Sequence, residues 1–389
     1  MKKYKYYEFF AGAGLVTLGL RKHWDCIWAN DIDPKKENTY KTNIESNNYH
    51  LSDIEKIQSK DLPIPCDMAW ASFPCQDLSL AGWRSGMSGE RSGTFWSFWR
   101  LIQGLNPPDR PKMIVLENVV GLLYDKDFIG LCEALSCLGM QFGALVIDGI
   151  HFVPQSRPRV FVVAVNRDMD CGPFVDPWHF NSPWISGQLE KVQSSLPQNL
   201  KDLWRWWKLP KPIEKDFSVE SIIETSDLNE WNTEEQTLQL LGMMNEHNLH
   251  KVKEVQKQKK LSIGFLYKRT RNGKVQAEIR FDGIAGCLRT PSGGSSRQVV
   301  VVVENSIIKS RLLSARETAR LMGVPDSFVL PTNYNEAYHA MGDGVIVPVV
   351  EWLSQHLLLP LISASNAFPL EKNHEHSAQF GISKSIRFL

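Results

Sequence analysis

Apolar residues near the start of the chain occur in short runs separated by longer amphipathic or polar segments. The runs at residues 6–10, 26–29, 68–71 and 113–116 have the length of buried strands, and the segments between them have the length of helices. This alternation predicts a parallel sheet covered by helices on both faces. Two further runs, 144–147 and 160–165, flank a turn at Pro154. A strong β signal this late in such a sheet favours an antiparallel edge strand.

The pattern changes after residue 170, where prolines and tryptophans interrupt it and residues 248–274 are strongly basic. A strand of five valines follows at 299–303. At Ser314 an S-x-x-E sequence predicts a capping box that opens a helix. A last amphipathic helix is expected at 347–359, with a loose tail after Pro360. We therefore divide the chain into a large α/β domain (1–169), a small irregular domain (170–330), a return to the large domain (331–362) and a tail (363–389).

Composition limits the class of protein. The chain has 389 residues, of which 43% are hydrophobic and 22% charged, as in ordinary globular proteins. An odd count of seven cysteines without a C-x-x-C pair argues against a disulfide framework and against a structural zinc site, so no metal is expected. Without a signal peptide or a long apolar run, we expect a cytosolic protein that binds no membrane. Since the net charge is only +1, binding to a polyanion requires local basic patches.

A glycine-containing turn follows the first predicted strand, in the sequence EFFAGAG at residues 8–14. Such a turn lets the backbone approach a ligand, although a turn with no ligand explains it equally well. Asp31 ends the second predicted strand, where a carboxylate can bond ribose hydroxyls, and Asp53 is placed to reach an adenine amino group. Together these residues indicate an adenosine-containing cofactor, which can be a dinucleotide or S-adenosylmethionine.

Cys75 lies directly after a predicted strand, on the turn made by Pro74, and a glycine-rich loop at 82–93 follows it. This position favours a nucleophile over core packing, and nearby cations would stabilise its thiolate. Glu117 ends another strand and so comes to the same sheet edge, although an acid that caps the next helix is an alternative. Arg157 and Arg159 alternate along an extended segment and can act as a pair. Taken alone, these arginines fit an ordinary surface equally well.

In this order, the motifs resemble those of a DNA (cytosine-5) methyltransferase of the bacterial restriction-modification type. They lie at residues 10–14, 73–76 (FPCQ), 117–119 (ENV), 155–159 (QSRPR), 311–328 and 340–345. The resemblance implies a Rossmann-like S-adenosylmethionine-dependent methyltransferase domain with a smaller, irregular target-recognition domain. It also implies duplex DNA as the substrate, with the target cytosine flipped out of the stack because its C5 and C6 are otherwise shielded.

The resemblance also assigns roles to residues. Cys75 would add to C6 of the cytosine, Glu117 would bond N3 and the exocyclic amine, Arg159 would bind O2, and Arg157 would help to set the site. The cofactor would be held by Phe10, Gly12, Gly14, Asp31, Ile32, Asp53, Ile54, Pro74, Asp343 and Val345. DNA contacts would come from Gln76, Ser79, Arg91, Lys268, Arg269 and Arg271.

Three positions depart from the family pattern. Glu8 stands where an aspartate is common, and Arg91 lies one place from the usual arginine of the loop. Asp343 stands where the family usually has asparagine. Its carboxylate would lie near the carboxylate of the cofactor, which should weaken binding unless Asp343 is rotated away or protonated.

Other functions remain open at the level of the sequence. An RNA (tRNA) cytosine-5 methyltransferase would use the same scaffold, and a catalytically silent DNA-binding paralogue is suggested by Asp343. A nicotinamide dehydrogenase explains none of Cys75, Glu117 or Arg159. The family further implies a monomer, with a separate restriction endonuclease as a candidate partner at the same DNA site.

Overall fold

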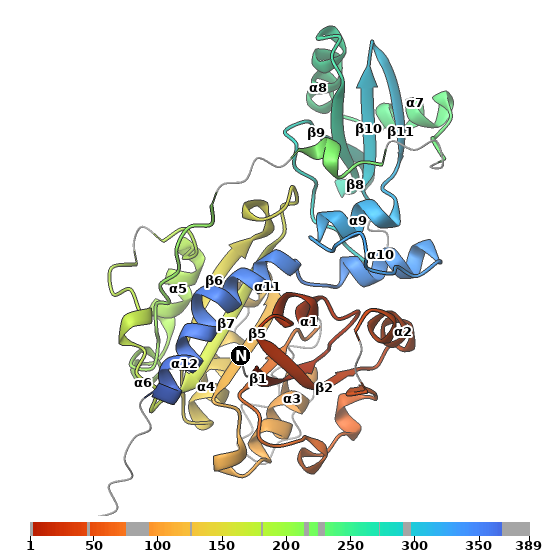
Figure 1. Cartoon of the computed structure of the whole chain (residues 1–389). Coiled ribbons are helices and arrows are strands. Elements are labelled where there is room, and N and C mark those ends of the chain that lie inside the picture. The colour runs from red at the N-terminus through yellow and green to blue at the C-terminus, as the bar shows by residue number, and fades with distance from the viewer. Residues whose placement is uncertain are drawn as a thin grey trace, which may run out of the picture.

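The computed structural model describes residues 3–44, 47–74, 93–124, 127–179, 182–213, 218–224, 230–271, 273–290 and 297–367. These residues form a large unit around a seven-stranded sheet and a small unit around a four-stranded sheet (Figure 1). The strand order is β3-β2-β1-β4-β5-β7-β6 in the large sheet and β11-β10-β8-β9 in the small one. The order of the large sheet reverses between β1 and β4, which is where open α/β sheets bind their ligands.

The large sheet is parallel except for one strand. Its strands are β1 (Tyr4–Phe9), β2 (Trp24–Asp31), β3 (Tyr49–Leu51), β4 (Met68–Ala71), β5 (Met113–Val119), β6 (Met140–Asp148) and β7 (Pro158–Asn166). The predicted α/β fold is confirmed, but the antiparallel strand is not at the edge. β7 pairs antiparallel with both β5 and β6, so β6 is the edge strand. The short connection between β6 and β7 turns the chain back beside β5.

Helices cover both faces of this sheet. One face carries α1 (Leu15–Leu20) and α11 (Val347–Leu353), and the other carries α3 (Thr94–Gln103) and α4 (Asp127–Cys137). α2 (Pro34–Asn43) follows β2 and begins with Asp33 as its N-cap. The carboxyl ends of β1, β2, β4 and β5 remain uncovered by these helices and form the edge at which a site can develop.

The predicted loose tail after Pro360 is wrong as far as residue 367. The chain continues from α11 through a π-helical turn (Ser354–Leu358) into α12 (Leu359–Ala367). Such a wider turn suits a proline, which cannot donate the usual backbone hydrogen bond. By length and composition the segment Tyr334–Ser365 could cross a membrane, but 67% of its apolar window is buried within the protein, as in a core helix.

Residues that follow position 170 pack against the large sheet. α5 (Gly187–Ser195) and α6 (Gln198–Lys201) lie along its β6 edge. There the Val146 amide donates to the Trp184 carbonyl at 2.8 Å, and the Phe142 amide donates to the Leu203 carbonyl at 3.0 Å. The domain division stays a prediction, but this packing favours a first boundary after residue 213.

The small unit combines an antiparallel sheet with two helices. Its elements are α7 (Glu234–Gly242), α8 (Glu246–Lys257), β8 (Ser262–Arg271), β9 (Lys274–Arg280), β10 (Val299–Glu304) and β11 (Ile307–Leu312). Val252 of α8 packs on Leu266, Ile279 and the valines of β10. α9 (Ala315–Leu321) and α10 (Tyr334–Gly342) then lead back to the large unit. Both hydrogen bonds of the predicted capping box between Ser314 and Glu317 are present.

Candidate active site

A cavity of about 660 Å³ opens at the carboxyl ends of β1, β2, β4 and β5. It lies at the reversal of strand order, as expected for a nucleotide-like ligand. Its walls include most of the residues that the sequence singled out for the cofactor, together with three predicted catalytic residues. These are Phe10, Gly12, Asp31, Ile32, Asp53, Ile54, Pro74, Asp343 and Val345 on the cofactor side, and Glu117, Arg157 and Arg159 on the catalytic side.

The glycine turn forms one wall of this cavity. Phe10 and Gly12 both have positive φ angles, 58° and 56°, so the chain reverses sharply after β1. A Cβ on Gly12 would have only Lys36 nearby, at 3.9 Å. Gly14 is absent from the cavity lining, and a Cβ there would meet Ile44 at 2.3 Å. The glycine at position 14 is therefore better explained by close packing against α2 than by the predicted contact with the cofactor.

The acids of the cavity are held by backbone amides. Asp31 accepts hydrogen bonds from Gly12 N at 2.9 Å and from Asp33 N at 3.0 Å, so it fixes the glycine turn while it faces the cavity. Asp53 caps the short helix that follows it by accepting from Glu55 N at 3.0 Å. Between these acids Ile32 remains 67% exposed. An exposed apolar side chain between two acids suits a ligand with a flat apolar ring and a polar sugar.

Asp343 is neutralised by a lysine that sequence reasoning missed. Lys36 Nζ, from α2, lies 2.8 Å from Asp343 Oδ2, and the Thr290 hydroxyl donates to Asp343 Oδ1. Burial opposes ionisation of Asp343, but Lys36, together with Thr290 and His339, holds the pKa of the carboxyl below its ordinary value. Asp343 is thus charged and paired, which answers the concern that its carboxylate repels the cofactor. Nothing in a single sequence relates Lys36 to a residue so far along the chain.

Glu117 lies near the carboxyl end of β5 and lines the cavity. Arg159 Nε lies 3.2 Å from Glu117 Oε1, and both side chains are largely buried. Burial raises the pKa of Glu117, and the neighbouring arginines offset this only in part. Its acid form therefore persists to higher pH than that of an ordinary glutamate. The next residue, Asn118, donates from Nδ2 to the Phe73 carbonyl at 3.0 Å and so ties β5 to the chain just before Pro74.

Arg157 holds the site together through backbone carbonyls. It is only 2% exposed. Its Nη1 donates to the Leu288 carbonyl, and its Nη2 donates to the carbonyls of Gly342 and Gly344, each at 2.7 Å. Burial lowers its pKa to about 10. These bonds direct its guanidinium at the loop around Asp343 and make it a positioning residue for the cavity wall.

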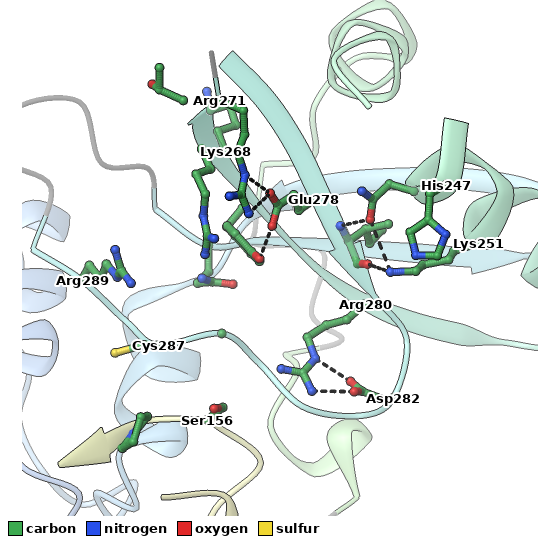
Figure 2. A pocket seen from close by; sticks show the side chains of 18 residues that line it. Ser156, His247, Lys251, Lys268, Arg271, Glu278, Arg280, Asp282, Cys287 and Arg289 are labelled. Carbon is green, nitrogen blue, oxygen red and sulfur yellow. Dashed lines mark hydrogen bonds and ion pairs between the residues drawn. The ribbon is translucent and has the colours of Figure 1, made fainter. Parts of the chain in front are cut away.

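A basic groove of about 810 Å³ lies on the other side of the segment 156–159 (Figure 2). Ser156 and Pro158 line the groove, whereas Arg157 and Arg159 line the cavity. This follows from the alternation of side chains in extended backbone. The groove includes the predicted DNA-contacting residues Lys268, Arg269 and Arg271, and also Lys251, Arg280 and Arg289, which the sequence analysis did not name as contacts.

Four predicted site residues, Cys75, Gln76, Ser79 and Arg91, lie outside the described residues. Pro74, the described residue that precedes Cys75, lines the cavity. Within the described part of the chain, no group of three or more histidine, cysteine, aspartate or glutamate side chains is arranged to hold a metal ion.

The sheet order and the cavity at its reversal point define a Rossmann-like fold that binds a nucleotide-like cofactor. A profile of the C-5 cytosine-specific DNA methylases matches residues 4–358. The chain belongs to this family and is a DNA cytosine-5 methyltransferase that uses S-adenosylmethionine. The resemblance inferred from the motifs is thereby confirmed.

Relatives with similar sequences are named as type II methyltransferases. M.MspI of Moraxella sp is 26% identical over 378 residues, which cover 95% of this chain and 73% of that protein. M.HhaI of Haemophilus parahaemolyticus is 25% identical over 360 residues, covering 91% of this chain and 94% of that protein.

Solved structures support the fold. The Dnmt2 methyltransferase of S. pombe superposes with a TM-score of 0.60 at 19% identity, over 92% of this chain and 99% of that one. The methyltransferase EhMeth of Entamoeba histolytica gives a TM-score of 0.62 at 15% identity, over 93% and 99% of the two chains.

The described residues fit S-adenosylmethionine. Phe10, Ile32 and Ile54 offer apolar surface for an adenine, and Asp31 and Asp53 offer acceptors for hydroxyl and amino groups. The loop at 342–344 lines the same cavity.

Proposed function

We propose that the protein methylates C5 of a cytosine flipped out of duplex DNA at a specific sequence. The observation that carries this proposal is the single cavity that joins the cofactor wall to Glu117 and Arg159. A basic groove lies directly behind the same backbone segment, so a base could leave DNA in the groove and enter the cavity. We further propose that the protein acts as a monomer in the cytoplasm and protects DNA from a partner restriction endonuclease, in keeping with relatives that are named type II methyltransferases.

In the proposed mechanism, the Cys75 thiolate adds to C6 of the cytosine. The electron pair of the C5=C6 bond then moves towards N3, where Glu117 in its acid form donates a proton. Arg159 holds Glu117 and faces O2. When bound, S-adenosylmethionine supplies the methyl group that C5 takes up. Loss of the C5 proton to a base and release of the Cys75 thiolate restore the C5=C6 double bond. The N3 proton returns to the Glu117 carboxylate, so that Cys75 and Glu117 regain their starting states.

The raised pKa of Glu117 supports this assignment, because a donor to N3 must keep its proton to higher pH than an ordinary glutamate does. Arg159 serves the opposite need. It stabilises the carboxylate that remains after the proton has moved, so the pair suits a step in which Glu117 changes its charge.

Transfer of labelled methyl groups from S-adenosylmethionine to mixed-sequence duplex DNA tests the proposal. We expect transfer by the wild-type protein and none by Cys75→Ser. Cys137→Ser is the matched control, because Cys137 is exposed at the end of α4 and should leave transfer unchanged. Bisulfite sequencing of the product identifies the methylated site. Absence of transfer to any duplex DNA, with transfer to structured RNA instead, would establish the RNA alternative.

The silent DNA-binding alternative depended on Asp343. Because Lys36 pairs with this carboxylate, Asp343 gives no reason to expect loss of cofactor binding. A calorimetric titration with S-adenosylmethionine measures this directly, and absence of binding would favour the silent paralogue.

A further inference from the structure

The cationic side chains of the groove differ in how firmly they are held. Arg280 of β9 is fixed by two hydrogen bonds to Asp282, from Nε to Oδ1 at 2.7 Å and from Nη2 to Oδ2 at 2.5 Å. Asp282 is itself anchored, because its Oδ1 accepts from Ile284 N at 3.3 Å. The side chain of Arg280 remains 32% exposed. It is therefore a fixed guanidinium that is still accessible from the groove.

Neighbouring arginines lack this arrangement. Arg271 bonds only Oε1 of Glu278, since the other oxygen of that carboxylate accepts from Tyr267. Arg269 is exposed, and its guanidinium lies 5.1 Å from the ring centre of Tyr267. A long exposed cation of this kind suits a phosphate, which can be contacted in many geometries.

The bidentate pair leaves a defined set of donors on Arg280. A guanidinium has five N–H groups, and Asp282 uses those at Nε and one at Nη2. Of the three N–H groups that remain, one at Nη1 and one at Nη2 point the same way and form a parallel pair. This pair matches the O6 and N7 acceptors of guanine in the major groove of DNA. Because the side chain is fixed before binding, little conformational entropy is lost on contact.

The position of Arg280 also suits base reading. β9 is the edge strand of the small sheet and forms a hairpin with β8, and the major groove admits a two-stranded ribbon of this width. Figure 2 shows Arg280 and Asp282 above Ser156, on the groove side of the segment 156–159. The opposite side of that segment lines the catalytic cavity, so Arg280 lies beside the route of the flipped base.

We infer that Arg280 is a specificity-determining residue that reads a guanine next to the target cytosine, with Asp282 as its positioning residue. The inference rests on the proposed function, since it requires methylation of duplex DNA. It assigns base recognition to Arg280, held by Asp282, and phosphate contact to Arg269.

The test is methylation of a random-sequence duplex library, read by bisulfite sequencing. We expect a guanine in the wild-type consensus at a position where Arg280→Ala loses roughly 10-fold or more of the discrimination. Asp282→Asn should relax the same position to a smaller extent, because it keeps Arg280 but weakens its orientation. Arg269→Ala is the matched control, with weaker methylation of all sites and an unchanged consensus.

Selection of bound sequences from the same library gives a second readout if Arg280→Ala proves inactive, and Arg280→Lys gives a milder variant. An Arg280→Ala or Arg280→Lys consensus as strict as that of the wild type at every guanine overturns the inference and leaves the proposed function standing. No methylation of the library by the wild-type protein overturns both.

Discussion

Replacing Lys36 with methionine should weaken the binding of S-adenosylmethionine. The change keeps a long side chain but removes the cation that neutralises Asp343. The Asp343 carboxylate then lies in the cavity wall without its lysine partner and keeps the hydrogen bond from the Thr290 hydroxyl. Because the cofactor carries a carboxylate of its own, we expect the two like charges to oppose binding.

The expected size of this effect follows from the geometry of the pair. Two unit charges at about 4 Å attract by about 4 kcal/mol when the effective dielectric constant is about 20. The side chains of Lys36 and Asp343 are 20% and 40% exposed, so solvent screens much of this attraction. Partly exposed ion pairs typically contribute up to about 1 kcal/mol, which corresponds to about a 5-fold change in Kd.

Isothermal titration calorimetry on Lys36→Met, Asp343→Asn and the double variant completes a double-mutant cycle. Asp343→Asn alone should change the Kd by less than about 2-fold, because Asp31 and Asp33 still lie close enough to Lys36 to favour its charged form. The double variant should recover most of the affinity that Lys36→Met loses. Lys35→Met is the matched control, since Lys35 pairs with Glu336 at 3.0 Å and does not line the cofactor cavity.

Two outcomes would refute this reasoning. The first is a Kd for Lys36→Met within about 2-fold of the wild type, which would mean that the charge of Asp343 does not reach the cofactor. The second is a double variant as weak as Lys36→Met, which would show that Lys36 acts without Asp343.

Two further predictions concern stability. Burial raises the pKa of Glu8 in the folded protein to about 8. Protonated Glu8 therefore contributes fully to the free energy of unfolding below about pH 4.5. This contribution is lost at about 1.4 kcal/mol per pH unit as the pH rises towards 8. Urea unfolding should therefore show a steeper loss between about pH 6 and 8 for the wild type than for Glu8→Gln, and equal slopes would contradict this. Arg157→Met should lower the free energy of unfolding by about 3 kcal/mol or more, because three carbonyls, two of them in buried hydrogen bonds, lose a charged donor. Arg159→Met should cost clearly less, and similar losses in chemical denaturation would count against the positioning role of Arg157.

The fold was largely predictable because it depends on local pattern. Strand β4 is apolar along its whole length, and the capping box at Ser314 needs only residues close in the chain. The position of β7 and the extent of α12 were not predictable in this way. Both depend on pairing and packing with elements far along the sequence, which periodicity does not encode.

For the site, the sequence indicated which residues would gather at one sheet edge but not what each would contact. Strand ends placed Asp31, Asp53 and Glu117 correctly, because parallel strands bring their carboxyl ends together. The pairing of Lys36 with Asp343 joins α2 to the loop after α10, and such contacts follow only from the folded chain. The same holds for Arg157, most of whose partners are backbone carbonyls, which do not depend on residue type.

The contacts around residues 342–344 connect three parts of the molecule. Lys36 forms an ion pair with Asp343 from the cofactor side, and the Thr290 hydroxyl donates to Asp343 from the segment that lines the groove. Arg157 donates to the carbonyls of Gly342 and Gly344. Arg157 also bonds Leu288 of that segment. A displacement of the groove wall by DNA would therefore act on the loop that lines the cofactor cavity. Since linkage is reciprocal, cofactor binding should affect DNA affinity by the same factor that DNA affects cofactor affinity.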